Sequence, residues 1–249
     1  MSGAIYVMWL RQLKRFWRSK ARMAGSLGQP LLFLFALGLG FGPVYSAAGQ
    51  GNYLLFLAPG VIAMSILFTS MFNGIEVIWD RQFGFLKETL VAPVSRINIM
   101  IGKTLGGATV ALIQGVVVLL LTFLFGFRVH SIGGFFLGLL FMILIAVLFT
   151  SLGIAIASRM TDMHGFPIIM NFLIMPIFFL SGALFPLENL PSVLSIITKI
   201  NPLSYGVDGV RGALTGTTHF GLGLDFLVCS VLAMIILFIG SKLFSKIEL

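Results

Sequence analysis

The sequence predicts an all-α membrane protein, a bundle of six transmembrane helices, and three observations carry this prediction. Apolar residues make up 58% of the 249 residues and charged residues only 10%, whereas a soluble domain carries about 25% charged residues. Continuously apolar stretches recur along the whole chain, and a bilayer core needs about 20 helical residues to cross it. These stretches also lack the alternation of apolar and polar residues that is typical of a membrane barrel.

Each candidate span is an apolar run bounded by charged or turn-forming residues. No polar stretch between the runs is long enough to build a soluble domain, so residues 1–249 are expected to form a single transmembrane domain. The six candidate spans are residues 27–45, 53–79, 104–127, 133–157, 165–184 and 222–241.

The distribution of basic residues predicts how this bundle is oriented. Six spans would place 13 of the 16 Lys and Arg residues on one side of the membrane and three on the other. Because Lys and Arg accumulate in the cytoplasmic segments that flank spans, both termini are predicted to be cytoplasmic. The same distribution explains the net charge of +8 without a nucleic-acid partner, so we expect none.

Residues 1–26 are predicted to form an amphipathic helix in the inner membrane interface. On a helical wheel the apolar side chains gather on one side, and most of the basic side chains gather on the other, toward anionic head groups. The apolar set is Ile5, Trp9, Leu13, Phe16 and Trp17, and the basic set is Arg11, Lys14, Arg15, Arg18 and Arg22. A cleaved signal peptide is the alternative, but the apolar run that follows has about 19 residues, which is longer than the usual 7–15.

No catalytic, metal or nucleotide site is predicted in this chain. Its single cysteine, Cys229, excludes an intrachain disulfide framework, and the three histidines are scattered without ligand spacing. Gly102-Lys103-Thr104 looks like the end of a phosphate-binding loop, but Ile97 stands where that motif requires a glycine. We therefore expect no enzyme activity, no metal and no cofactor bound by this chain.

The inner connection between the second and third spans carries the most information. Trp79, Phe83, Leu86 and Leu90 recur at helical spacing and predict an apolar stripe on a helix over residues 80–92, which Pro93 would end. Charges of both signs surround this stripe. A helix with mixed charges fits a groove on another protein better than an anionic membrane surface. An ordinary interfacial helix is the alternative.

Two segments of the chain resemble those of a known family. In the inner connection the residues are Glu76, Arg81, Gly84, Leu90, Pro93, Ser95, Gly102 and Lys103; in the outer segment they are Ser181–Pro186, Leu190-Pro191, residues 201–205, Asp208 and Arg211. The first segment looks like the first cytoplasmic loop, and the second like the last outer segment, of ABC type-2 exporter permeases. The chain is similar to the daunorubicin-resistance type of drug-export permeases, and the resemblance covers essentially its whole length.

This resemblance implies that residues 80–92 are a coupling helix that docks onto a separate ATPase subunit. It also implies two ATPase copies, a second copy of the permease, ATP and magnesium bound on the ATPase, and a location in the cytoplasmic (inner) membrane of a prokaryote. The docking residues would be Asp80, Arg81, Phe83, Gly84, Leu86, Lys87, Glu88 and Leu90.

Residues 186–220, between the last two spans, are predicted to form two short amphipathic helices separated at Asn201-Pro202. Neither is long enough to cross a bilayer. The resemblance implies that they are re-entrant helices closing the outer end of the pathway, with Pro202, Tyr205, Asp208 and Arg211 as an outer gate; a plain outer hairpin is the alternative. Asp208 and Arg211 stand three residues apart and could form an ion pair.

Few polar residues interrupt the predicted spans. The candidate pathway residues are Asn73, Gln114 and Asn171, whereas Glu76 and Lys103 lie near the inner ends, where a gating and a structural role are both open. We expect Arg81 or Lys103 to partner Glu76. The absence of a mid-span ionisable residue argues against an ion-coupled carrier.

The sequence therefore predicts the membrane subunit of an ATP-driven exporter with a hydrophobic or amphiphilic, drug-like or lipid-like, substrate. The alternatives are an autonomous channel or ion-coupled secondary carrier, an exporter of lipid-linked glycans, and a membrane-anchored assembly protein without transport activity.

Overall fold

The computed structural model describes residues 2–47, 51–91, 94–188 and 190–245. Every regular element within these ranges is an α-helix, as the sequence predicts. The helices are α1 (Ser2–Arg18), α2 (Lys20–Ala47), α3 (Tyr53–Phe72), α4 (Ile75–Gln82), α5 (Phe85–Val91), α6 (Arg96–Leu124), α7 (Ile132–Ala157), α8 (Gly165–Phe179), α9 (Ser192–Ile200), α10 (Pro202–Thr215) and α11 (Leu222–Ser245).

Five helical stretches of the described chain are long and apolar enough to cross a membrane. They are Met23–Ala47, Tyr53–Gln82 (α3 and α4 together), Arg96–Leu124, Ile132–Ala157 and Leu222–Ser245. The predicted fifth span, residues 165–184, is represented by α8, which has 15 residues and ends at Phe179. At about 1.5 Å per residue this helix is roughly 22 Å long, shorter than a bilayer core of about 30 Å.

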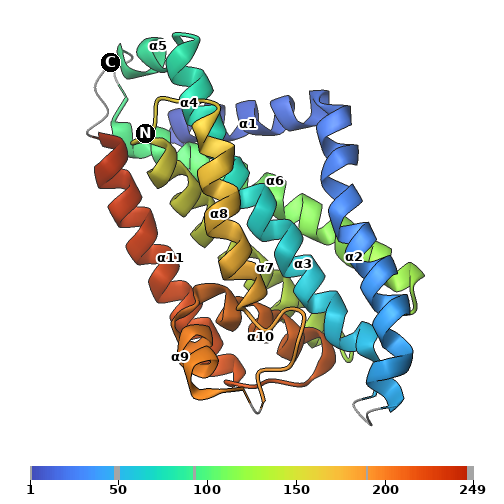
Figure 1. The fold of residues 1–249 in the computed structure, drawn as a ribbon. Helices are drawn as coiled ribbons and strands as arrows, with labels where there is room; N and C mark the ends of the chain where they lie inside the picture. Colours follow the sequence, from blue (N-terminus) through green and yellow to red (C-terminus); the bar gives the residue numbers. More distant parts are fainter. Residues whose placement is uncertain (1, 48–50, 92–93, 189, 246–249) are drawn as a thin grey trace.

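The long helices run between two ends of the molecule (Figure 1). Helix α1 lies across one end, and α4, α5 and the last turns of α11 lie at this same end. Helices α9 and α10 lie at the opposite end. The described part of the chain thus has one end with the basic helix α1 and another with the two short helices predicted between the last spans.

Helix α1 packs tightly against α6 because two glycines of α6 leave room for it. A Cβ atom added at Gly102 would lie 2.7 Å from Met8 Cβ, and one added at Gly106 would lie 2.6 Å from Gln12 Cβ. Phe16 of α1 is also buried. The predicted single helix over residues 1–26 is divided at Ser19, where α1 ends and α2 turns away (Figure 1).

The predicted continuous helix over residues 80–92 is wrong. Helix α4 ends at Gln82, and α5 begins at Phe85. Gly84 between them has a φ of +79°, a left-handed conformation that only glycine adopts without strain and that ends helices. Ala92 and Pro93, the expected end of the helix, lie outside the described residues.

Two short helices occupy the outer segment. Asn201 separates them: its side chain accepts a hydrogen bond from the Leu203 amide, and Pro202 stands in the first turn of α10, a position that suits a residue without an N–H group. Helix α10 is buried in the bundle, whereas α9 has an exposed apolar face that includes Val193 and Ile200.

Candidate functional site

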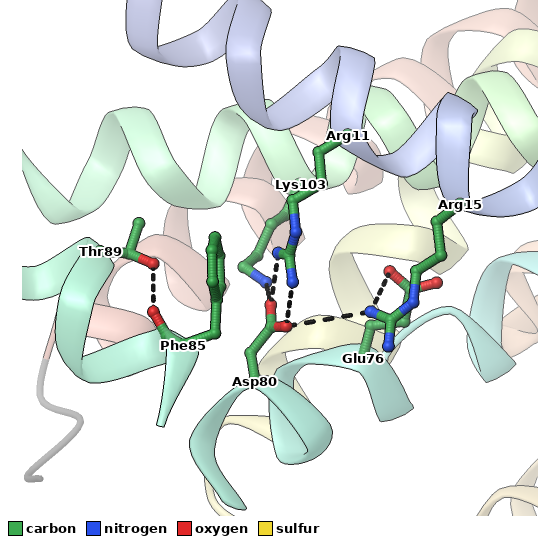
Figure 2. Close-up of polar contacts among 7 residues, drawn as sticks. All are labelled: Arg11, Arg15, Glu76, Asp80, Phe85, Thr89 and Lys103. Carbon is green, nitrogen blue, oxygen red and sulfur yellow. Dashed lines mark hydrogen bonds and ion pairs between the residues drawn. The ribbon is translucent and has the colours of Figure 1, made fainter. Parts of the chain in front are cut away.

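Asp80 lies at the centre of a buried cluster of charged side chains at the α1 end of the molecule (Figure 2). It accepts two hydrogen bonds from Arg11 of α1, at 2.9 Å to Oδ2 and 2.5 Å to Oδ1. It also accepts a hydrogen bond from Lys103 of α6. Only 3% of Asp80 and 1% of Lys103 are exposed, so the ion pair between α4 and α6 is shielded from water, whereas Arg11 of α1 is 30% exposed.

A second ion pair extends this cluster. Arg15 Nη1 lies 3.7 Å from Glu76 Oε2 and 3.9 Å from Asp80 Oδ1, and Glu76 is buried. Arg15 is thus a partner of Glu76, a role that the sequence analysis assigned to Arg81 or Lys103. Arg11 and Arg15 were also expected to face lipid head groups. Instead, both guanidinium groups point toward the bundle, where they form ion pairs with the buried carboxylates of Asp80 and Glu76.

The spacing of these residues explains how two helices bring them together. Arg11 and Arg15 are four residues apart on α1, and Glu76 and Asp80 are four residues apart on α4. Residues four apart in a helix share one face, so two basic and two acidic side chains meet as a pair of matching rows. This double i, i+4 pattern is a sequence signal for the cluster that the sequence analysis missed.

Two aromatic contacts connect the cluster to its surroundings. The Arg11 guanidinium lies 3.6 Å from the centroid of the Phe85 ring, and that of Arg15 lies 5.1 Å from the Trp79 ring. Cations at these distances are attracted to the face of an aromatic ring. Phe85 is the first residue of α5, and its carbonyl accepts a hydrogen bond from Thr89 one turn later (Figure 2). Helix α5 is therefore attached to α1 through Arg11.

The opposite side of α4 is fixed to the connection between α7 and α8. Arg81 donates hydrogen bonds to the carbonyl oxygens of Ser158 (3.0 Å) and Met160 (3.1 Å). Gln82 donates one to the carbonyl oxygen of Thr161 (2.9 Å). Arg81 therefore binds this chain's own backbone and is half-buried, rather than forming part of an exposed surface.

The predicted docking residues divide into buried and exposed sets. Asp80 and Leu86 are buried within the chain, so their expected place on a docking surface is wrong: the turn at Gly84 directs Leu86 into the core. Phe83 is 78% exposed, and Lys87 and Glu88 are exposed. The side chain of Leu90 lies outside the described residues. Gln82 and Val91, which were not predicted to dock, are exposed beside them. We call these five exposed residues the α4–α5 face: Gln82, Phe83, Lys87, Glu88 and Val91.

Comparison with known proteins identifies what kind of chain carries this arrangement. The family model described as ABC-2 type transporter matches residues 3–215. The chain belongs to the ABC-2 type transporter family. It is therefore a membrane-embedded transport subunit of the ABC exporter type, in a family of permease components rather than catalytic enzymes.

Individual relatives agree with this assignment. The putative transport permease ycf38 of Cyanophora paradoxa is 31% identical over 203 residues, which cover 80% of this chain and 69% of the relative. Nodulation protein J of Rhizobium leguminosarum bv. trifolii is 30% identical over 202 residues, covering 79% and 75%. Nodulation protein J of Sinorhizobium fredii is 25% identical over 228 residues, covering 91% and 86%.

The three candidate pathway residues of this ABC-2 transporter chain are not gathered at one place. Asn73 is buried and donates a hydrogen bond to the Gly107 carbonyl at 3.0 Å. Gln114 of α6 is buried too, and its Nε2 has no hydrogen-bond partner among the described residues. Asn171, by contrast, is exposed on α8 beside Phe172, which is 83% exposed. Asn73 and Gln114 therefore belong to the interior of the bundle, and Asn171 to its surface.

At the other end of this ABC-2 transporter chain, Asp208 and Arg211 bind separate partners instead of forming the expected pair. Asp208 accepts hydrogen bonds from the backbone amides of His219 and Phe220. Arg211 donates to the carbonyl oxygens of Gly182 (2.9 Å) and Phe56 (3.4 Å). Burial lowers the pKa of Arg211 to about 10, so it still carries its charge at neutral pH.

Tyr205 completes this outer group. Its hydroxyl donates a hydrogen bond to the Lys199 carbonyl at 2.8 Å, and its ring stacks on Phe220 at 4.8 Å. The predicted outer-gate residues thus connect α10 to the loops on either side of it. Asp225, in the first turn of α11, was not among the predicted site residues; it is fully buried and interacts with Asp208.

Proposed function

We propose that this chain is the membrane subunit of an ATP-driven exporter that moves hydrophobic or amphiphilic cargo, drug-like or lipid-like, out of the cytoplasm or the inner leaflet. The observation that carries the proposal is the α4–α5 face, which stands directly beside a buried charge cluster. An ATPase subunit would contact the exposed Phe83, Lys87 and Glu88. ATP and magnesium would be bound on that subunit and not on this chain.

The charge cluster supplies the mechanical connection that such a subunit needs. A displacement of α5 acts on α1 through Phe85 and Arg11. A displacement of α4 acts on α1 and α6 through Asp80. Because separating buried charges from their partners is strongly unfavourable, the three helices would move together. ATP drives the change only if it binds the closed ATPase pair more tightly than the open one.

The proposed assembly contains two ATPase copies and a second copy of this chain, in the inner membrane of a prokaryote. Both termini would be cytoplasmic and α8 would be a sixth, short crossing. The bias of 13 of 16 basic residues to one side supports this orientation. The common location of α1, the α4–α5 face and the last turns of α11 at one end supports it as well (Figure 1).

Helices α9 and α10 would close the outer end of the pathway in this proposal. The hydrogen bonds of Asp208, Arg211 and Tyr205 hold α10 to the neighbouring loops, so opening would require these contacts to exchange. Amphiphilic cargo is favoured because the spans carry few hydrogen-bonding side chains. A lipid-linked glycan remains a second cargo class.

Reconstitution in liposomes tests the proposal against an autonomous carrier. Vesicles containing this chain together with its ATPase are expected to accumulate a fluorescent hydrophobic amine only when ATP and magnesium are present. Vesicles with this chain alone are expected to show no uptake above empty vesicles, with or without an ion gradient. The measurement is the initial rate of dye uptake. Uptake by the chain alone, driven by an ion gradient and abolished by an ionophore, would contradict the proposal.

A further inference from the structure

A cavity of about 360 Å³ lies between the elbow of α1 and α2 and the inner part of α3 and α4. Phe16 and Pro30 line it from the elbow, and Phe68, Phe72 and Trp79 line it from the opposite side. Near this elbow α2 stands apart from α3, and the two helices converge toward their other ends (Figure 1). The α4–α5 face does not line this cavity, and the charge cluster approaches it only where Arg15 lies over the Trp79 ring.

The wall of the cavity is mainly apolar. The indole Nε1 of Trp79 is buried and has no hydrogen-bond partner among the described residues. A buried donor without a partner is unfavourable. Because the wall encloses this N–H group, a ligand in the cavity would meet the ring of Trp79 and the apolar side chains of Phe68 and Phe72.

The charge around the rim is positive. The Arg15 guanidinium lies 5.1 Å from the centroid of the Trp79 ring, and Trp79 lines the cavity. Lys14 and Arg18 are exposed on the same helix and line a shallow groove together with Arg15. Within the cluster Arg11, Arg15 and Lys103 face two carboxylates, which leaves one positive charge in excess. An anionic head group is therefore favoured over a zwitterionic one.

We infer that this cavity binds one acyl chain of an anionic membrane lipid, taken from the leaflet in which α1 lies. The chain packs against Phe16, Phe68, Phe72 and the ring of Trp79, and the head group lies near Arg15 and Arg18. Binding would hold the elbow of α1 and α2 against α3. This is a site for a resident lipid on this chain itself, and it does not depend on the ATPase docking proposed above.

Photolabelling of the purified full-length chain tests the inference. The chain is placed in vesicles that contain phosphatidylglycerol with a diazirine in its acyl chain, and labelled peptides are mapped by mass spectrometry. Labels are expected in residues 23–30 and 64–79. Absence of labels from both segments, with labels elsewhere on the chain, would overturn the inference. No ATPase is present, so the result is independent of the proposed transport function.

Two glycines of α2 provide a matched pair of variants. Gly25 lines the cavity, and a Cβ atom added there meets no heavy atom within 4 Å; Gly25→Leu is therefore expected to take up part of the space. Gly28 is equally unobstructed and does not line the cavity. Labelling is expected to fall several-fold in G25L and to stay unchanged in G28L. Undiminished labelling in a folded G25L chain would overturn the site.

The head-group preference has its own control. The same diazirine chain on phosphatidylcholine is expected to label these segments several-fold less than phosphatidylglycerol does. Equal labelling by the two lipids would overturn the assignment of an anionic lipid. Arg15→Gln is expected to reduce the difference between them, and its thermal unfolding checks that the chain remains folded.

Discussion

Replacing Asp80 with alanine is expected to destabilise the chain by about 3–5 kcal/mol, the cost of removing one partner of a buried ion pair. Lys103 is 1% exposed, so without Asp80 its ammonium group loses its hydrogen-bonded counter-charge and cannot reach water. Arg11 would lose both of its hydrogen bonds to the carboxylate as well. The measurement is thermal unfolding of the detergent-purified chain, followed by tryptophan fluorescence and by the monodisperse fraction on gel filtration.

A double variant separates the loss of a charge partner from the loss of the side chain itself. Asp80→Ala combined with Lys103→Met removes both buried charges, and we expect it to recover a large part of the lost stability, because a matched apolar replacement of a buried pair is often tolerated. Lys87→Ala, an exposed change on α5, should leave the unfolding temperature unchanged. A D80A chain as stable as the parent would contradict the importance of the cluster.

Phe83→Glu is expected to abolish binding of the ATPase subunit while the chain stays folded. Phe83 is 78% exposed, so the change costs little within this chain. In a docked complex, however, it places a carboxylate where an aromatic side chain is expected to be buried. Truncating or replacing such a central residue costs about 2 kcal/mol or more, which is roughly thirtyfold in affinity. The measurement is co-purification with the ATPase and stimulation of ATP hydrolysis.

Two further variants test whether a loss of ATPase binding in F83E is specific to position 83. Lys14→Glu also adds a carboxylate to an exposed position at the same end of the molecule, but on α1, and ATPase binding is expected to survive it. Leu86→Glu should lower stability instead, because Leu86 is fully buried. If F83E retained full ATPase binding while remaining folded, the docking role of the α4–α5 face would be wrong.

The fold class could be predicted from the sequence because membrane spans leave a one-dimensional signal. A long apolar run bounded by charges is visible without knowing any neighbour, and the basic residues beside the runs add an orientation. The break in the helix at Gly84 was harder to predict from the sequence. Trp79, Phe83, Leu86 and Leu90 keep helical spacing on both sides of it, and only the backbone conformation of the glycine shows that the stripe is divided.

The charge cluster illustrates what local reasoning cannot supply. The sequence contains both i, i+4 pairs, Arg11 with Arg15 and Glu76 with Asp80, but nothing local says that α1 packs against α6, where its arginines reach α4, and not on the lipid surface. That depends on Gly102 and its close contact with α1, which is a property of the packed bundle.

At the outer end, the sequence suggested an ion pair that the folded chain does not form. Asp208 and Arg211 are close enough in sequence to form a pair, and that proximity suggested one. In the folded chain, the backbone amides of His219 and Phe220 compete for the carboxylate, and the Gly182 carbonyl competes for the guanidinium. Hydrogen bonds to buried backbone groups satisfy donors and acceptors that would otherwise be left unpaired, so they replace the local ion pair.

The most direct test of the account is a photo-cross-link from position 83 in membranes that contain the assembled transporter. A photoreactive phenylalanine analogue is placed at Phe83 or, as a control, at Phe172 of α8, which is similarly exposed at 83%. The account predicts a covalent adduct with the ATPase subunit from position 83 and none from position 172. An ATPase adduct from position 172 but not from position 83, in a complex that still hydrolyses ATP, would contradict it.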